Sequence, residues 1–357
     1  MSGPELVSQV LPEPFLVFQT KHIGDFLMSL PALGLLRRHC RGPIGVVVAP
    51  AITELAIRHA WIDDVYTLDR TKGFEHIWKL AKAIKRKGYG TALILDGQTR
   101  SAVTAVLSRI KNRLGAPGLY ALGNAARLYT HQADIVDSQW PWQSQAYRGQ
   151  KVAATVLGLE AGPPIRPKPP EPDPLSLKRA EKMLKELPGL GPRIGLTLQG
   201  LQPEKSWPLA NFVLLCQWLW QEMKASMFIT GGAGDARAAE VVIKASKVPV
   251  ANFCGRTGLS DVISLAAKSD LFITIDTGTA HLAALTDTPL ISIYTWTSPA
   301  LWPPQTPNAK LMVYDWALRR FGLRFSDGPW VSTPVVTPEM VFKEAVDILQ
   351  SRPGLSG

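Results

Sequence analysis

The chain has 357 residues, of which 46% are hydrophobic and 19% charged, and its formal net charge is +10. This composition excludes a disordered chain, and at roughly 150 residues per domain it predicts two domains. The positive balance favours acidic partners, such as phosphates, nucleic acid or an anionic membrane surface. Residues 1–160 hold 19 Lys and Arg against 12 Asp and Glu, so most of the excess lies in the first half.

The three cysteines, Cys40, Cys216 and Cys254, are far apart and form no C-x-x-C spacing. This spacing indicates neither a metal knuckle nor a disulfide framework. The first 15 residues lack the basic and apolar regions of a signal peptide. The most apolar helical stretch, 209–221, is shorter than the roughly 20 residues that a membrane span needs. We therefore expect a cytoplasmic protein in a reducing compartment.

Short β-branched runs alternate with longer amphipathic runs along the whole chain, and each half repeats this order. Near-continuous apolar strands between helices predict parallel sheets that are covered on both faces. Each half is thus expected to be a Rossmann-like α/β unit. The expected strands are 15–19, 44–49, 64–68, 92–96, 193–199, 226–231, 250–254, 271–275 and 290–295; the expected helices are 25–40, 52–60, 74–87, 209–223, 235–246, 260–268, 279–286 and 338–350.

A proline-rich segment, "AGPPIRPKPPEPDP" at residues 161–174, separates the two halves. Such a segment forms neither a helix nor a central strand, and it favours an extended polyproline conformation. We interpret it as the linker between a first domain, residues 1–165, and a second domain, residues 175–335. Two such domains are expected to face a cleft at the carboxyl ends of their strands.

The first chemical motif follows the strand "LFITI", where Asp276 leads through Thr277, Gly278 and Thr279 into a helix that contains His281. A helix start offers backbone N–H groups and a positive partial charge, which suit a phosphate. The glycine lets a ligand approach the backbone. The alternative is that the acid or the first threonine only caps the helix, and the motif by itself does not decide between the two.

A second motif lies in the first domain, where the strand "FLVFQ" leads through Lys21 and Gly24 to Asp25 at a helix start. The glycine permits a tight turn or a close ligand. A carboxylate at a helix N-terminus stays ionised at neutral pH, which suits a general base acting on a sugar hydroxyl. The alternative is an acid that only complements the helix dipole.

Two weaker motifs follow in the second domain. Lys205 lies in a loop after the strand at 193–199, where a lysine could neutralise a diphosphate. Asp235 follows the glycine-rich turn "GGAG" and could hold ribose hydroxyls. The alternatives are an exposed loop lysine and an ordinary acid at a helix start.

The order of these motifs resembles the heptosyltransferases of glycosyltransferase family nine, from about residue 15 to 349. The blocks "DTGTAHLAA", "KSWPLANF" and "IGDFLMSLPALGLLRR" carry the resemblance most specifically. It implies a GT-B fold of two Rossmann-like domains, with the last segment, 336–357, containing a helix that packs back on the first domain. It also implies an inverting, metal-independent transfer from ADP-heptose to an acidic lipopolysaccharide core acceptor, with no cofactor.

The resemblance assigns roles to particular residues. Asp25 matches the catalytic base, beside Lys21 and Gly24 in the acceptor turn. The residues that match the donor site are Lys205 at the phosphates, Asp235 at the ribose, Thr257 in the loop beside adenine, Asp276 near the sugar, and Thr277, Gly278, Thr279 and His281 along the diphosphate.

The chain departs from the family pattern in two places near the donor pocket. The turn at 294–299 reads Y-T-W-T-S-P, where the family usually shows a Phe-Gly-Pro-Thr-like turn, and the loop at 200–202 reads G-L-Q. These departures leave open the exact sugar and nucleotide. They also leave open two rival functions: a nucleotide-sugar epimerase of the same fold, and a non-catalytic protein that binds nucleotides or glycans.

Two further expectations concern surfaces. Residues 119–130 and 138–151 either form an acceptor-side surface near the inner membrane, or are ordinary loops that pack their tryptophans. Nucleic acid is not an expected partner, because the basic patches lack interleaved aromatic residues and no recognised module is present.

Overall fold

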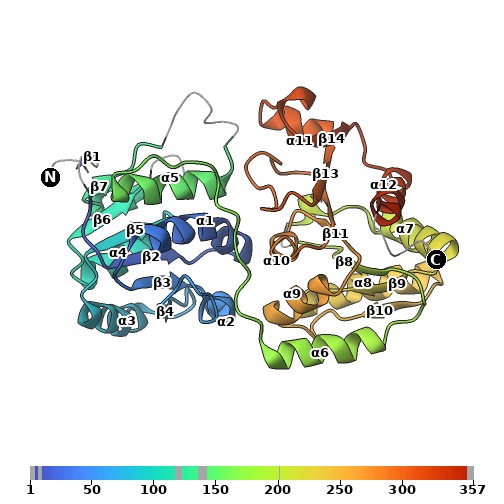
Figure 1. Ribbon diagram of the computed structural model, residues 1–357, viewed down its shortest axis with the longest axis horizontal. Helices are drawn as coiled ribbons and strands as arrows, with labels where there is room; N and C mark the ends of the chain where they lie inside the picture. The colour runs from blue at the N-terminus through green and yellow to red at the C-terminus, as the bar shows by residue number, and fades with distance from the viewer. Residues whose placement is uncertain (1–4, 7–9, 117–122, 136–142, 201, 352–357) are drawn as a thin grey trace. The chain divides into compact units, whose positions relative to one another are not determined.

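The computed structural model describes residues 5–6, 10–116, 123–135, 143–200 and 202–351. The chain divides into two compact units, Met1–Glu171 and Pro172–Gly357, coloured blue to green and green to red in Figure 1. The division falls inside the proline-rich segment 161–174.

The first unit is built on a parallel sheet of seven strands in the order β1-β7-β6-β5-β2-β3-β4. After β1 at one edge, the chain enters the middle of the sheet at β2, moves outward to β4, and then returns to β5 on the other side of β2. The gap between β2 and β5 is therefore the topological switch point of this sheet. The strands are β1 (Glu5–Leu6), β2 (Phe15–Gln19), β3 (Ile44–Val48), β4 (Asp64–Thr67), β5 (Thr91–Ile94), β6 (Asn112–Gly115) and β7 (His131–Gln132).

Helices cover this sheet (Figure 1). Alternate side chains of the strands, such as Leu16 and Phe18 of β2, pack with the helices α3 and α4 in one core cluster. The helix α1 packs against α5, β2 and β3, so every residue from 26 to 36 is buried. Burial on all sides explains why this part of α1 is apolar all round and has no polar face. The helices are α1 (Ile23–His39), α2 (Thr53–Ala56), α3 (Phe74–Lys87), α4 (Thr99–Leu107) and α5 (Gln145–Leu157), with 3₁₀ turns η1 (Pro50–Ile52) and η2 (Gly123–Leu128).

One sequence expectation fails in this unit. Residues 145–151 of the segment 138–151 are not a loop, because they form the first half of α5. Ser144 caps this helix by accepting the N–H of Tyr147, and residues such as Val152 bury its inner face. Residues 119–122 and 138–142 of the two expected surface segments lie outside the described residues.

The second unit repeats the same plan with a parallel sheet in the order β10-β9-β8-β11-β12-β13-β14. Its topological switch point lies between β8 and β11. The strands are β8 (Arg193–Leu196), β9 (Ser226–Ile229), β10 (Val250–Asn252), β11 (Leu271–Ile275), β12 (Leu290–Tyr294), β13 (Ala309–Tyr314) and β14 (Trp330–Thr333).

Alternation along β11 separates the two faces of this sheet. Ile273 and Ile275 pack with α7, α8 and α12, whereas Phe272 packs with α6, α9 and α10. The helices are α6 (Pro174–Lys185), α7 (Leu209–Met223), α8 (Ala236–Ser246), α9 (Leu259–Ala267), α10 (Gly278–Ala283), α11 (Asp315–Arg320) and α12 (Pro338–Gln350), with 3₁₀ turns η4 (Pro203–Lys205), η5 (Ala233–Asp235) and η6 (Phe325–Asp327).

The last helix, α12, belongs to the core of the second unit. Its buried side chains Val341, Ala345 and Leu349 join the cluster of α7 and β11, and Trp207 donates to the carbonyl of Val336 just before it (2.9 Å). Its apolar face is thus used within the second unit. That the segment 336–357 also packs on the first domain stays a prediction.

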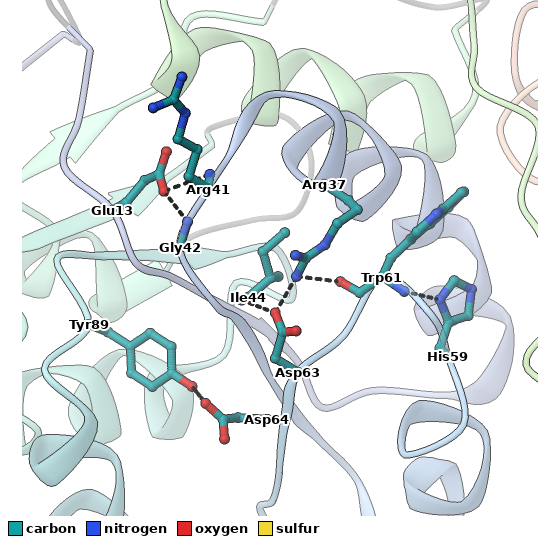
Figure 2. A network of polar contacts seen from close by, with 10 residues as sticks. All are labelled: Glu13, Arg37, Arg41, Gly42, Ile44, His59, Trp61, Asp63, Asp64 and Tyr89. Atoms are coloured by element: carbon teal, nitrogen blue, oxygen red, sulfur yellow. Dashed lines mark hydrogen bonds and ion pairs between the residues drawn. The ribbon is translucent and has the colours of Figure 1, made fainter.

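A polar network fastens the amino ends of the first unit's strands (Figure 2). The Glu13 carboxylate accepts the N–H of Gly42 at 2.6 Å, and Asp63 accepts the N–H of Ile44 at 2.7 Å. Asp63 also pairs with the Arg37 guanidinium. These carboxylates satisfy backbone donors just before β3 and at its first residue. Because ligands of such folds bind at the opposite, carboxyl edge, this network is structural.

His59 holds the linker to the first unit. The residue is 3% exposed, and its Nδ1 accepts the N–H of Trp61. The ring proton therefore lies on Nε2, which donates to the carbonyl of Lys168 at 3.1 Å. The N–H of Glu171 donates to the carbonyl of Arg58 nearby (2.8 Å). Burial lowers the pKa of His59 to about 4.

This buried histidine predicts acid sensitivity. Its folded pKa of about 4 lies below the unfolded value of 6.5, so the unfolded chain binds the proton first as pH falls. Above about pH 7, His59 should therefore not lower the free energy of unfolding. Between about pH 7 and about pH 5, that free energy should fall by about 2 kcal/mol. Urea titrations at both pH values measure this difference. In His59→Gln the difference should shrink; an unchanged difference would contradict the assignment.

Among the described residues, no helix combines the length and the apolar character that crossing a bilayer requires.

Candidate active site

The sequence motifs collect at the carboxyl edges of the two sheets, beside the two switch points. In the second unit, Asp276 follows β11 and Lys205 lies in the loop that follows β8. In the first unit, Asp25 lies in the first turn of α1, which follows β2.

At the edge of the second unit, Asp276 is an ion-pair partner and not a helix cap. Its carboxylate is 4% exposed, and its Oδ2 accepts from Lys205 Nζ at 2.8 Å and from Thr297 Oγ1. The N-cap of α10 is Thr277, whose side chain makes no capping hydrogen bond. The capping alternative for this motif is therefore not realised.

The hydroxyl of Thr277 is buried and has no hydrogen-bond partner among the described residues. Buried hydroxyls are almost always paired, so a lone one at the start of a helix needs an explanation. Gly200, in the loop after β8, lies close enough that a Cβ there would approach Thr277 Cγ2 to 3.0 Å. A ligand oxygen placed between these backbones would supply the missing partner.

Lys205 is held in place for this site. It ends the 3₁₀ turn η4, and its side chain is 23% exposed, against 6% for Asp276. An ammonium group has three protons and donates only one of them to Asp276. The Lys205 ammonium therefore pairs with a buried carboxylate and, being partly exposed, can also donate to a ligand. The exposed-loop alternative for Lys205 is wrong.

The unusual turn at 294–299 contributes directly to this cluster. Thr297 donates to Asp276, and Thr295 donates to the carbonyl of Glu204 at 2.7 Å, which fixes the residue beside Lys205. Tyr294 donates to the carbonyl of Trp302 at 2.7 Å, and burial, followed by the nearby Asp276 charge, raises its pKa. Sequence reasoning noted this turn only as a departure. It did not identify Thr297, although a hydroxyl in the loop after the next strand was the available signal.

The remaining donor-site residues are placed as follows. Gly278 and Thr279 are half-buried in the first turn of α10, and His281 is 5% exposed in the same short helix. Asp235 folds back on its own turn, where its Oδ2 accepts the N–H of Gly232 at 2.7 Å. Thr257 lies 3.3 Å from the hydroxyl of Thr230, which follows β9.

These placements form two groups. Asp276, Lys205 and Thr277 meet beside β8 and β11, whereas Asp235 and Thr257 follow the next strands, β9 and β10. Gly255 N–H donates to the carbonyl of Gly231 at 3.0 Å, which ties the loops after β9 and β10 together. An extended ligand lying along this edge would touch both groups.

In the first unit, the turn after β2 brings Lys21 beside Asp25. The N–H of His22 donates to Asp25 Oδ2 at 3.2 Å, so the acid does cap the start of α1. Burial lowers the pKa of Lys21, while the charges of Asp25 and Asp96 oppose that shift. Gly24 is half-buried at the same turn.

Asp96 is the residue that sequence reasoning missed in this unit. It follows β5, is fully buried, and accepts from Thr20 N–H (3.0 Å), Thr20 Oγ1 (2.6 Å) and Ser101 Oγ (2.7 Å) on one oxygen. The N–H of Gln98 donates to its other oxygen at 3.0 Å. Burial raises its pKa, and these bonds oppose the shift. Asp96 thus anchors Thr20, which precedes Lys21.

Among the described residues, no group of three or more His, Cys, Asp or Glu side chains is arranged to hold a metal ion.

Comparison with known proteins decides the family. A sequence profile described as glycosyltransferase family 9 (heptosyltransferase) matches residues 77–319, which is more than half of the chain. The chain belongs to this family. It is thus a glycosyltransferase, and α10 and the Lys205 loop lie inside the matched region.

A curated relative of this family 9 protein is lipopolysaccharide heptosyltransferase 2 of Salmonella typhimurium, which is 26% identical over 313 residues, 83% of this chain and 87% of the relative. Among solved structures, E. coli ADP-heptose lps heptosyltransferase II matches with a TM-score of 0.73 at 21% identity over 95% of this chain and 99% of its own. A glycosyltransferase family 9 protein from Veillonella parvula matches with a TM-score of 0.81 at 17% identity, over 96% of this chain and 100% of its own. These matches confirm two Rossmann-like domains of the GT-B class.

Proposed function

We propose that this family 9 protein moves a heptose, or a related sugar, from ADP-heptose to an acidic lipopolysaccharide core acceptor, with inversion and without a metal ion. The names of the matched relatives support the sugar, the nucleotide and the acceptor. The observation that carries the proposal is the cluster of Lys205, Asp276 and the unpaired Thr277 hydroxyl beside the second switch point. It combines a cation, a donor hydroxyl and a helix start, which together suit a diphosphate.

The proposed reaction is a single displacement. Asp25 takes the proton of an acceptor hydroxyl, the acceptor oxygen bonds to the anomeric carbon, and the bond from that carbon to the diphosphate breaks. Charge then develops on the leaving ADP, where Lys205 and the backbone N–H groups at 277–279 stabilise it. Asp276, released from part of its ion pair, accepts from the sugar hydroxyls. Asp235 and Thr257 contact the ribose and the loop beside adenine.

The basic first unit suits the acidic acceptor. Its turn carries Lys21 next to Asp25, so an anionic group of the acceptor would be attracted to the base. We place the enzyme in the cytoplasm, in peripheral contact with the inner face of the inner membrane, since a lipid-linked core acceptor is found there.

A transfer assay tests the proposal directly. The chain is incubated with a panel of nucleotide sugars and deep-rough lipopolysaccharide, and products are weighed by mass spectrometry. We expect one added heptose with ADP-heptose, unchanged turnover in EDTA, and an inverted anomeric centre by NMR. A sugar of changed configuration without acceptor would indicate an epimerase instead. ADP binding with no transfer to any acceptor would indicate a binding protein.

A further inference from the structure

The positive charge of the chain is concentrated in one segment of the first unit. Residues 70–113 hold 11 Lys and Arg against 2 Asp and Glu, a difference of +9 in a chain whose net charge is +10. One of the two acids is Asp96, which is fully buried. The surface formed by this segment therefore carries Glu75 as its only acid among 44 residues, and Glu75 is paired with Lys79 (2.6 Å). This segment includes α3, β5 and α4.

The helix α3 presents an unusual outer face. Its inner face, Ile77, Leu80, Ala81 and Ile84, packs in the core of the unit. Phe74 and Trp78 nevertheless point away from that core: they are 62% and 47% exposed, more than any other described Phe or Trp. Lys82 and Lys85 continue the same stripe at helical spacing. We call Phe74, Trp78, Lys82 and Lys85 the α3 stripe.

The cations at the end of this stripe are not neutralised. Among the described residues, no carboxylate pairs with Lys82, Lys85 or the neighbouring Arg86, and all three are exposed. In contrast, Lys87 pairs with Asp64 at 2.7 Å. An unpaired cationic cluster next to two exposed aromatic rings is typical of helices that lie on an anionic lipid surface.

The orientation of α3 brings its aromatic end to the reactive edge of the sheet. His76 Nε2 lies 3.1 Å from the carbonyl of Thr67, at the carboxyl end of β4. At the other end of the helix, Lys87 pairs with Asp64, at the start of β4. The helix therefore runs antiparallel to β4. Phe74 and Trp78 lie toward the carboxyl edge, on which Asp25 is found.

We propose that the α3 stripe is a membrane-docking face that binds the surface of an anionic phospholipid bilayer. Phe74 and Trp78 enter the headgroup and acyl boundary, and Lys82, Lys85 and Arg86 contact the lipid phosphates. Docking at this end holds the carboxyl edge of the first unit at the lipid surface. The inference deepens the proposed peripheral contact by naming its surface and partner, and it rests on the proposed function only for the identity of the acceptor.

A lipid surface fits this face better than a nucleic acid does. The aromatic side chains stand at one end of a convex helix, and the cations follow them along the same flank, which matches a flat interface with an apolar interior. The stripe lies on a single helix, and β4 is an outer strand of the sheet, whereas binding of single-stranded nucleic acid typically combines a basic groove with stacking aromatic side chains.

Vesicle co-sedimentation with the full chain tests the proposal. Vesicles of phosphatidylcholine alone are compared with vesicles that contain phosphatidylglycerol. We expect binding only to the anionic vesicles, weakened by salt. Phe74→Ser/Trp78→Ser and Lys82→Glu/Lys85→Glu should each lower the partition coefficient by about tenfold or more. These four positions are exposed, so circular dichroism and ADP binding should match the wild-type chain.

A control variant on α6 removes an exposed apolar side chain and reverses two exposed lysine charges, as the α3 variants do. Leu175 is 64% exposed, and Lys178 and Lys182 are exposed on the same helix. Leu175→Ser/Lys178→Glu/Lys182→Glu should retain vesicle binding. Transfer to a detergent-dispersed acceptor is read in parallel and should be unchanged in every α3 variant. If transfer is absent from all chains while vesicle binding still depends on α3, the proposed function fails and the docking face stands.

Three results would overturn the docking face. One is a wild-type chain that stays in the supernatant with anionic vesicles. A second is vesicle binding that both α3 variants retain at the wild-type level. The third is a loss of binding to a single-stranded oligonucleotide in both variants with no change in vesicle binding, which would assign the face to nucleic acid.

Discussion

Asp25→Asn is expected to lower kcat by about 10³-fold while the Kd for ADP stays unchanged, because the amide cannot accept the acceptor's proton. The amide oxygen can still accept the His22 N–H that Asp25 accepts in the structure (3.2 Å). The variant therefore separates the role of a base from that of a helix cap. Kinetics with saturating donor and calorimetry with ADP supply the two measurements.

Two further variants complete this test. Asp25→Ala should lose the same activity and, in addition, about 1 kcal/mol of stability, because the cap is lost as well. Asp173→Asn is the matched control: Asp173 caps α6 by accepting the Leu175 N–H at 3.4 Å, so turnover should not change. Near-normal turnover in Asp25→Asn would remove this residue from the chemistry and leave it as a cap.

Lys205→Met is expected to reduce kcat/KM by about 10²-fold or more and to raise the KM for the donor, because it removes a cation that faces the developing negative charge. It should also lower the free energy of unfolding by about 2 kcal/mol, since Asp276, at 6% side-chain exposure, loses its 2.8 Å partner. Steady-state kinetics and urea unfolding measure the two effects.

The double variant Lys205→Met/Asp276→Asn distinguishes the two effects. Removing both charges should restore most of the lost stability but none of the lost activity. Lys185→Met, at an exposed position on α6, should change neither. If Lys205→Met left donor KM and kcat unaltered, the ion pair would be structural only, and the proposed diphosphate seat would be wrong.

The sequence predicted the central strands of both sheets well, because these are buried on both faces and read as apolar runs. All nine expected strands are present within a few residues of the expected ends. Five strands were missed: β1, β6 and β7 in the first sheet, and β13 and β14 in the second. β6 contains Asn112 and Arg113 and β7 is only two residues long, so neither shows an apolar run. Short or half-covered strands depend on a neighbouring strand already being in place.

The same limit applies to the site. The turn after β11 and the acid in the first turn of α1 could be recognised because each motif is local. The pairing of Lys205 with Asp276 spans 71 positions, and only the order β8-β11 in the sheet brings the two together. Asp96 ends an apolar strand just as Asp276 does, so its position carried a signal. Nothing local revealed that Thr20 and Ser101 would surround it.

Asp96 and Asp276 occupy equivalent places, since each follows the strand that lies across the switch point from its unit's first central strand. Asp96 is buried and accepts hydrogen bonds from the neutral donors Thr20 and Ser101, and its charge acts on Lys21. Asp276 instead accepts from a partly exposed ammonium group, that of Lys205, as well as from the Thr297 hydroxyl. An incoming anion can therefore compete with Asp276 for the Lys205 ammonium, whereas the hydrogen bonds of Asp96 hold Thr20 and the turn after β2 in place.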